Sequence, residues 1–401
     1  MTLAILAALA AVAGCAAQTS ASAPAAQAPA AQAPAASAPA AWPAEGSGTT
    51  STLYDVGCLT AARCFAVGDA GTLLATTDGG RAWHREASPA GVSGSAPLYR
   101  IACVPPASCY VIARPATILV THDAGAHWAA RALGVQVPGL ASAGCVILEV
   151  ESPIVETPCQ LGLLDISCHS ALTCYAVATA PGGWDTNPTS QASGPGSSLW
   201  LTQDGGASWS RQPIPPGVVC DGDCSQSPLY GYPLEWVSCA PSGPCWAAGN
   251  ELIGSHEGFA AAWLVTPAPG GSWRLEPPGC LPGVCSGPVT DVGACPTNNL
   301  CYAVNNDKPF GDSSSVGSYT ATGQNGPDVT VPDGLALNDI ACPAAHTCYA
   351  AGDGGVILRT TNGTGFTPIK TRTRENLYGI TCVTASDCYA VGAAGTIEVL
   401  R

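Results

Sequence analysis

Apolar and polar residues alternate along most of this chain in short segments that are separated by turn residues. In the clearest case, the alternating segment Leu53–Cys58 leads to a cysteine, five residues follow, and Cys64 opens another apolar segment. Alternation over four to eight residues predicts a strand, and a short polar loop between two such segments predicts an antiparallel hairpin. The pattern therefore predicts an all-β protein built from short strands.

The same hairpin is written seven times, always with five residues between its two cysteines. The pairs are Cys58 and Cys64, Cys103 and Cys109, Cys168 and Cys174, Cys239 and Cys245, Cys295 and Cys301, Cys342 and Cys348, and Cys382 and Cys388. A unit of this size cannot bury its apolar faces alone, so it predicts repeated sheets that pack on one another.

A second signature follows the hairpin in the first three units, where a threonine, an acid, a glycine and a tryptophan recur at fixed spacing. The aspartate and glycine suit a hairpin turn, and the tryptophan opens a fourth strand and packs against the sheet. Because the signature recurs with the repeat, we expect a structural role and no catalytic one. The residues concerned are Asp78, Trp83, Asp123, Trp128, Asp204 and Trp209.

These repeats resemble the Asp-box (BNR-repeat) propeller superfamily. The superfamily includes sialidases, certain endoglucanases and propellers related to photosystem II assembly and stability factors, and the last are the most similar in general character. The resemblance covers residues 42–401 and implies a seven-bladed β-propeller with four-stranded blades, whose radial repetition protects the sheet edges.

The two ends of this region predict how the ring closes. The last unit stops at Leu400, after its third strand, while Ala41, Trp42 and Pro43 supply a tryptophan ahead of the first unit. We expect this N-terminal strand to complete the last blade.

The remaining cysteines also have near neighbours, apart from Cys15. They form the couples Cys145–Cys159, Cys220–Cys224 and Cys280–Cys285. In an exported chain this arrangement predicts ten disulfides. Zinc is the alternative for close cysteines, but it needs four convergent ligands, and these couples are spread around the ring. We predict neither a metal nor a cofactor.

The N-terminus predicts export. An apolar run from Leu3 to Ala13 is too short to span a bilayer and ends in Val12-Ala13-Gly14-Cys15, which resembles the lipobox of bacterial lipoproteins. The resemblance implies acylation of Cys15, and an ordinary secretory signal is the alternative. We expect a signal peptide at 1–15, a disordered Ala/Pro-rich tether at 16–41 and the propeller at 42–401. The protein would be lipid-anchored on the outer side of the bacterial cytoplasmic membrane, or secreted.

Composition narrows the choice of partner. A net charge of -14 with only 14 lysines and arginines offers no basic surface for nucleic acid or for an anionic membrane. We therefore expect a monomer that meets the membrane only through its lipid anchor and binds an unidentified protein or glycan at the cell surface.

Binding residues are expected on one face of the ring. The resemblance implies that the connections between second and third strands, and between blades, share a face, and the irregular insertions fall in these connections. The candidates for ligand binding are Trp184, Asp185, Asp221, Asp223, Tyr230, Tyr232, Asp307, Phe310 and Asp312. The alternative is that these aromatic residues only pack their own loops.

Four acids at the start of the first strands form a second candidate set, and we expect them at equivalent positions in their units: Asp55, Asp165, Asp291 and Asp339. We expect them around the mouth of the central channel, where they would bind a cation or a basic peptide. The more favoured interpretation is that they cap turns between blades.

Hydrolysis is the alternative function. A sialidase needs three arginines, a tyrosine nucleophile with a glutamate base, and an acidic aspartate, and the arginines here form no convincing triad. Arg100 stands at the strand position that Asp55 and Asp165 occupy in their own units. Loop acids such as Glu149, Glu151, Asp185 and Asp221 would have to converge for another glycosidase mechanism. The sequence therefore predicts a non-catalytic binding or assembly module, with a carbohydrate-active hydrolase as the alternative.

Overall fold

The computed structural model describes the chain in segments, all within the second of two compact units, Met1–Pro39 and Ala40–Arg401. The described residues are 44–87, 92–114, 116–133, 162–179, 197–214, 217–219, 227–229, 234–241, 243–253, 258–266, 270–275, 292–306, 314–320, 323–324, 329–330 and 335–401. None of the helices in these segments is long and apolar enough to cross a membrane.

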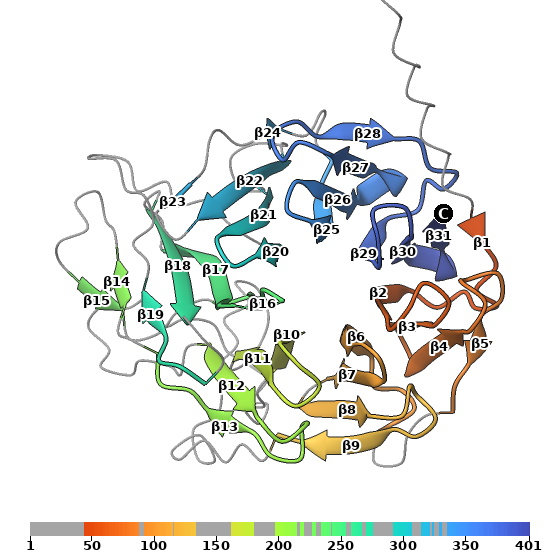
Figure 1. Ribbon diagram of the computed structural model, residues 1–401, viewed down its shortest axis with the longest axis horizontal. Helices are drawn as coiled ribbons and strands as arrows, with labels where there is room; N and C mark the ends of the chain where they lie inside the picture. Colours follow the sequence, from red (N-terminus) through yellow and green to blue (C-terminus); the bar gives the residue numbers. More distant parts are fainter. Residues whose placement is uncertain are drawn as a thin grey trace, which may run out of the picture. The chain divides into compact units, whose positions relative to one another are not determined.

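Strands make up nearly all of the regular structure in these segments (Figure 1), with six four-stranded sheets, one five-stranded sheet and one two-stranded sheet. Two four-stranded sheets near the N-terminus comprise β2 (Leu53–Cys58), β3 (Cys64–Gly68), β4 (Thr72–Thr76) and β5 (His84–Arg85), then β6 (Leu98–Val104), β7 (Ser108–Ala113), β8 (Thr117–Thr121) and β9 (Ala129–Ala132). Two more comprise β10 (Gly162–Cys168), β11 (Cys174–Thr179), β12 (Ser198–Thr202) and β13 (Ser210–Arg211), then β16 (Trp236–Cys239), β17 (Cys245–Ile253), β18 (Gly258–Thr266) and β19 (Arg274–Leu275).

The C-terminal third contains the other large sheets. The five-stranded sheet comprises β20 (Val292–Thr297), β21 (Leu300–Asn306), β22 (Ser314–Thr320), β23 (Gly323–Gln324) and β24 (Val329–Thr330). The four-stranded sheets comprise β25 (Leu337–Ala344), β26 (Thr347–Gly352), β27 (Ile357–Thr360) and β28 (Thr367–Ile369), then β29 (Leu377–Cys382), β30 (Cys388–Gly392), β31 (Ile397–Leu400) and the N-terminal β1 (Ala44–Glu45). The small sheet pairs β14 (Gly217–Val219) with β15 (Ser227–Leu229), and η1 (Asp353–Gly355) and η2 (Ala393–Gly395) are single 3₁₀ turns.

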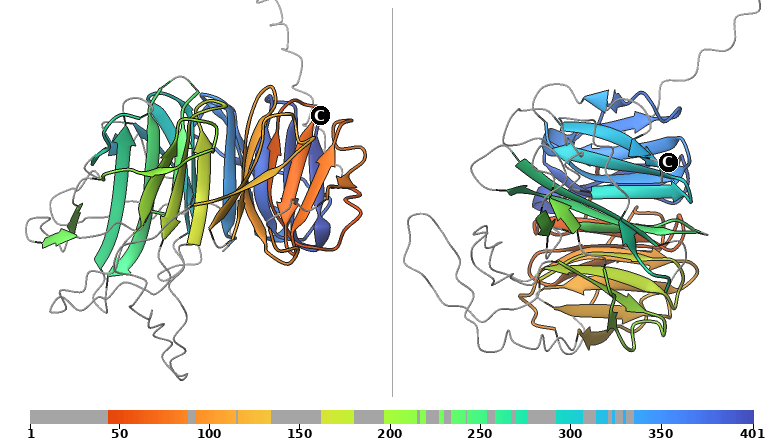
Figure 2. Two further views of the ribbon diagram at one scale, coloured as in Figure 1. Left: turned by 90° about the horizontal axis from the view of Figure 1, so that it is seen from below. Right: turned by 90° about the vertical axis from the view of Figure 1, so that its left-hand side faces the viewer.

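The first strands of the large sheets contact one another in sequence around a common axis (Figures 1 and 2). The contacts run from β2 to β6, β10, β16, β20, β25 and β29, and β29 contacts β2 again. Each later strand lies farther from the axis, in the order that a propeller blade requires. The prediction of an all-β propeller with four-stranded blades is confirmed.

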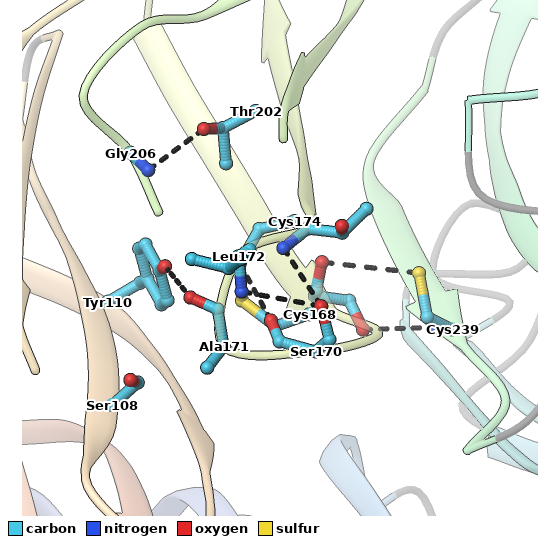
Figure 3. The surroundings of a disulfide bond; sticks show 12 residues. Ser108, Tyr110, Cys168, Ser170, Ala171, Leu172, Cys174, Thr202, Gly206 and Cys239 are labelled. Atoms are coloured by element: carbon cyan, nitrogen blue, oxygen red, sulfur yellow. Dashed lines mark hydrogen bonds between the residues drawn. A yellow bond between two sulfur atoms is a disulfide. The ribbon is translucent and has the colours of Figure 1, made fainter. Parts of the chain in front are cut away.

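All seven predicted hairpin disulfides are present. Each joins the last residue of a first strand, or a residue close to its end, to a cysteine near the start of the second strand, with Cα atoms 3.9 to 4.1 Å apart. Figure 3 shows the bridge between Cys168 and Cys174. Closing a seven-residue loop should stabilise each hairpin by roughly 2 kcal/mol on loop-entropy grounds. The couples Cys145–Cys159, Cys220–Cys224 and Cys280–Cys285 lie outside the described residues, as does Cys15.

The hydrophobic core lies between sheets. One cluster packs Phe65, Val67 and Leu73 of β3 and β4 against Val111 and Leu119 of β7 and β8. No backbone ladder crosses from one of these sheets to the other, so side chains must join them. Each sheet is therefore stabilised mainly by its two neighbours.

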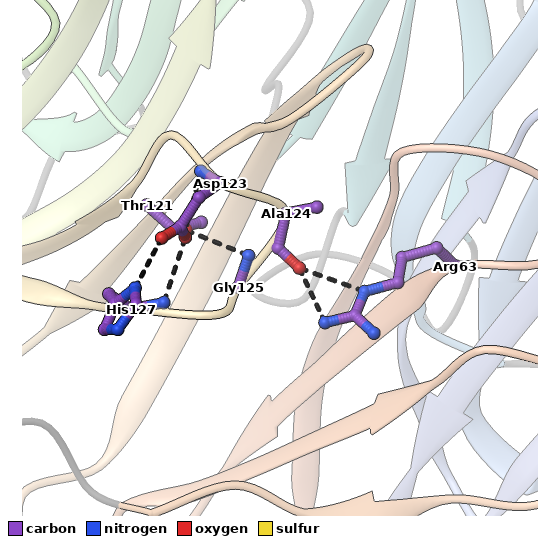
Figure 4. A network of polar contacts seen from close by, with 6 residues as sticks. All are labelled: Arg63, Thr121, Asp123, Ala124, Gly125 and His127. Atoms are coloured by element: carbon purple, nitrogen blue, oxygen red, sulfur yellow. Dashed lines mark hydrogen bonds and ion pairs between the residues drawn. The ribbon is translucent and has the colours of Figure 1, made fainter.

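Second-strand tyrosines add a polar contact to each of several interfaces. Their hydroxyls donate to a carbonyl in the disulfide turn of the next sheet, and these inter-sheet hydrogen bonds are Tyr110 to Ala171 at 2.6 Å, Tyr302 to Ala345 at 3.0 Å, Tyr349 to Ala385 at 2.6 Å and Tyr389 to Ala61 at 2.6 Å (Figure 3). Phe65 holds the same strand position but has no hydroxyl. There, Arg63 donates from Nε and Nη2 to the carbonyl of Ala124 at 3.0 and 2.6 Å (Figure 4).

The acid-glycine turns share one hydrogen-bond geometry. The Thr121 hydroxyl donates to Asp123 at 2.8 Å and accepts from the Gly125 N–H at 2.9 Å, while Asp123 also accepts from the His127 N–H at 2.9 Å (Figure 4). The turns around Asp78 and Asp204 repeat this set of contacts. Because these donors stabilise the ionised carboxylate, the pKa values of all three acids lie below the usual range.

The tryptophans of these turns stand just before the fourth strands and reach the neighbouring sheet. Trp83 packs edge-on against Tyr389 with ring centroids 6.4 Å apart, and Trp128 packs against Phe65 at 5.5 Å. Trp209 is half-buried against the cluster that contains Tyr110 and Ile166. The turns thus contribute to architecture, in agreement with their repetition.

A hydroxyl deletion tests the inter-sheet tyrosines. Tyr389→Phe keeps the ring but removes the hydrogen bond to Ala61, so it should lower the free energy of unfolding by about 1 kcal/mol. Tyr378→Phe is the matched control, because its hydroxyl takes no part in these inter-sheet contacts. Denaturant titration of the oxidised protein measures both, and equal stability of the two variants would contradict the assignment.

Candidate functional site

The loop residues predicted to bind ligand lie outside the described residues. These are Trp184, Asp185, Asp221, Asp223, Tyr230, Tyr232, Asp307, Phe310 and Asp312, and the same holds for Glu149 and Glu151 of the hydrolase alternative. They stay predictions. The candidate site consists of other residues, which lie in the described part of the ring.

Three of the four predicted first-strand acids do occupy equivalent positions. Asp55 lies opposite Val67, Asp165 opposite Val177, and Asp339 opposite Ala351. Asp291 is outside the described residues. The register of β20 with β21 shows that its predicted equivalence to Asp55 is wrong. Val292 lies opposite Val304 and so takes the position of Asp55, because the fifth hairpin has one residue more between its acid and its cysteine.

These carboxylates are turned toward the neighbouring first strand. Asp55 accepts from the Ile101 N–H, Asp165 from the Val237 N–H and Asp339 from the Ile380 N–H, all at 2.8 Å. Asp55 and Asp339 are only 7% and 8% exposed. A structural role is therefore the better interpretation of these acids. They join neighbouring first strands near the axis, whereas the prediction was that they cap turns between blades.

Arg100 lies among these acids. Its Nε is 3.9 Å from Asp165 Oδ1, and the charges of Asp339 and Asp55 also act on it. Burial raises the pKa of Asp55 to about 8 and that of Asp165 to about 6, while Arg100 opposes both shifts. Burial raises the pKa of Asp339 as well. One guanidinium faces three carboxylates, two of them buried and one partly exposed, so the cluster favours protonation at a higher pH than free aspartates do.

Aromatic residues precede the axial position in three adjacent sheets. Tyr54 of β2 has ring centroids 5.5 Å from Tyr99 of β6 and 6.1 Å from Tyr378 of β29. All three side chains are half-buried, so part of each ring faces solvent. They form a continuous aromatic surface at the start of the first strands.

The residue after each second strand completes this surface. In the sheet of β2 this residue is Asp69, which accepts a hydrogen bond from the Tyr54 hydroxyl at 2.8 Å. In the sheet of β6 it is Arg114, whose guanidinium carbon lies 3.8 Å from the centre of the Tyr99 ring. Within the described part of the chain, Arg114 Nε has no hydrogen-bond partner. We call Tyr54, Tyr99, Tyr378 and Arg114 the Tyr–Arg patch.

The patch has the chemistry of a recognition surface. Tyrosines provide broad apolar faces with a polar edge, and a guanidinium stacked on a ring keeps its N–H groups in the plane for a carboxylate or carbonyl oxygen. Below it, the axial carboxylates are committed to backbone N–H groups. The described residues contain no group of three or more His, Cys, Asp or Glu side chains that could hold a metal ion.

Sequence reasoning missed this patch, although a signal was present. Tyr54, Tyr99 and Tyr378 precede the axial position in their units, and an arginine replaces the acid after the second strand in one unit. The two positions are 15 residues apart in each unit, and only the hairpin register brings them together.

Comparison with known proteins agrees with the β-propeller fold. A family model described as photosynthesis system II assembly factor YCF48 matches residues 34–163, which is less than half of the chain. No curated protein matches the chain at a significant level of sequence similarity.

Solved structures share the fold at low sequence identity. One described as YCF48 bound to D1 peptide has a TM-score of 0.58 and 14% identity, and covers 91% of this chain and 99% of its own. YCF48 from Cyanidioschyzon merolae has a TM-score of 0.58 and 16% identity, with 90% and 99% covered. A catalytically inactive virginiamycin B lyase from Staphylococcus aureus with quinupristin has a TM-score of 0.59 and 10% identity, with 90% and 98% covered. At these identities the likeness extends to the fold alone.

The axial cluster predicts how stability depends on pH. The folded-state pKa values of Asp55 and Asp165 lie above their unfolded values, so the folded protein binds more protons and its stability should fall as the pH rises from about 4 to about 8. Each extra proton contributes a slope of about 1.4 kcal/mol per pH unit. Asp55→Asn should reduce that slope, whereas Asp78→Asn, at an exposed turn, should not. Denaturant titrations at several pH values measure this, and an unchanged slope in Asp55→Asn would contradict the assignment.

Proposed function

We propose that this protein is a non-catalytic binding or assembly module that holds a polypeptide segment on the Tyr–Arg patch. The observation that carries the proposal is the stacking of Arg114 on Tyr99 at 3.8 Å, beside two more half-buried tyrosines. Aromatic and arginine side chains are the residue types that most often dominate the energy of protein interfaces.

Charge favours a segment that carries a carboxylate. Arg114 Nε is buried and has no hydrogen-bond partner among the described residues, so a carboxylate would have to bind the Nη groups of the stacked guanidinium. The tyrosine rings would accept the apolar part of the same segment. That a similar propeller is described with a bound peptide agrees with a protein partner.

We also infer that the ring has seven blades and that β1 completes the last one. In support, the five-stranded sheet occupies a place in the sequence of first-strand contacts equivalent to that of the four-stranded sheets. Ala44 of β1 pairs with Glu398 in the same way that Arg85 of β5 pairs with Leu74. Trp42 and Trp83 each stand two residues before the paired residue, so they take equivalent places in the sequence. Trp42 itself is outside the described residues.

The assignment of the turns to the Asp-box class and export with acylation at Cys15 complete the proposal. The shared hydrogen bonds of the Asp78, Asp123 and Asp204 turns support the first. The tetrad that ends in Cys15 supports the second. A lipid anchor and a tether would present the patch to partners at the cell surface, and a glycan partner is the alternative outcome.

A displayed peptide library tests the binding site. Selection on the purified, oxidised protein should enrich segments that carry a carboxylate next to apolar residues. Arg114→Ala and Tyr99→Ala should each weaken the selected peptide by roughly tenfold or more, because truncating a central interface residue costs about 1 to 3 kcal/mol. Arg131→Ala, at an exposed residue on β9 of the same sheet, is the matched control and should leave the affinity unchanged. Equal binding by all three variants would exclude the patch as the site.

A further inference from the structure

A buried carboxyl group occupies a core position on β31. Glu398 is fully buried and lies opposite Ala390 of β30. In two other sheets the same register places a leucine opposite an alanine: Leu74 opposite Ala66, and Leu358 opposite Ala350. A carboxyl group therefore stands where equivalent sheets bury an apolar side chain, which is unfavourable unless the group is compensated.

The compensation is weak. Neither Glu398 oxygen is solvent-accessible, and neither has a hydrogen-bond partner of good geometry among the described residues. Burial raises the pKa of Glu398 to about 7, and the backbone N–H groups of Arg372 and Thr373 and the charge of Arg372 oppose the shift.

Charged residues also belong to the elements that pack around this carboxyl group. The connection from β28 to β29 carries Lys370, Arg372, Arg374 and Glu375, which are all exposed, and β27 of the neighbouring sheet carries Arg359. β30 presents Ala390 opposite Glu398, while on β1 Ala44 lies opposite it and Glu45 lies opposite Ile397. Arg372 and two backbone N–H groups therefore favour the ionised form of Glu398, against the burial that favours the neutral form.

This carboxyl group stands at the seam between the two ends of the folded unit. β1 pairs with β31 only at Ala44–Glu398 and Glu45–Ile397. A pocket of about 750 Å3 opens beside the seam, and residues 46–50, 372–373 and 394–397 line it. The segment after β1 lies against Gly395, since a Cβ there would be 2.0 Å from the carbonyl oxygen of Thr49. The pocket thus borders the backbone next to Glu398, at Thr396 and Ile397.

We propose that Glu398 is a proton-dependent clasp for the N-terminal strand, which holds β1 when it is protonated and loosens it when it is ionised. This inference depends on the assignment of β1 as the fourth strand of the last blade. The neutral acid lies opposite Ala390 of β30, at a position that a leucine holds in other sheets. The carboxylate gains hydration only if β1 moves away from β31, so ionisation favours the open seam.

The direction with pH follows from the proton balance. Because burial raises the pKa of Glu398 from 4.5 to about 7, a closed seam that buries the group binds the proton more tightly than an open seam that exposes it. Closure is therefore strongest at acid pH and weakens as the pH rises from about 5 to about 7. The N-terminal strand β1 would therefore be bound less strongly to β31 at neutral pH than at acidic pH.

Hydrogen exchange at β31 measures the clasp directly. After correction for intrinsic exchange, protection of whichever amides of Ile397 and Glu398 face β1 should fall by at least about tenfold between pH 5.5 and pH 8, while the amides of β31 that face β30 stay protected. Glu398→Gln should abolish this dependence and keep the seam closed at both pH values. Glu398→Leu restores the residue type of the other sheets and should do the same if the glutamine variant folds poorly.

Two controls separate the clasp from other titrations. Glu375→Gln changes an exposed acid in the neighbouring connection and should retain the pH response. Asp55→Asn should alter global stability and also retain the local response at β31. An undiminished pH response in both Glu398 variants, or uniform protection of β31 in the unmodified protein at all pH values, would overturn the proposal. The measurement needs no ligand, so its failure is distinct from a failure of the binding site.

Discussion

Side-chain contacts between neighbouring sheets are the constraint on which this structure depends. In the segments that the structure describes, backbone ladders end at the edge of each sheet, so side chains largely fix the angle between one sheet and the next. Apolar clusters fill most of each interface, the second-strand tyrosines fasten the disulfide turns, and the axial carboxylates join the first strands. Disulfides act differently, since they stiffen each hairpin without linking it to another.

The candidate site follows from the same constraint. The inter-sheet contacts place Tyr378, Tyr54 and Tyr99 on three adjacent first strands within 5.5 to 6.1 Å of their neighbours. No single sheet contains this surface, which exists only when the ring is assembled. The buried charges near the axis belong to the scaffold beneath it, where Asp55 and Asp339 align strands and Arg100 limits the electrostatic repulsion.

Local chemistry predicted the repeated parts of the fold well. The invariant cysteine spacing predicted the hairpins, and the turn residues around Asp78 predicted a hydrogen-bonded turn, because both depend on residues close in the chain. Asp291 was misaligned because the extra residue before Cys295 shifts the register by one. The patch at Arg114 and the buried Glu398 were missed, since each depends on a register or an interface that joins distant segments. The loops that were expected to bind ligand stay predictions.

The exchange rates of three backbone amides test the inter-sheet constraint most directly. The N–H groups of Ile101, Val237 and Ile380 have carboxylate partners on neighbouring sheets. If these contacts hold the ring together, the three amides should exchange only when the whole unit unfolds, with protection equal to that of the central second strands. Exchange at the rate of exposed turn amides, while the second strands stay protected, would show that the sheets are held by something else.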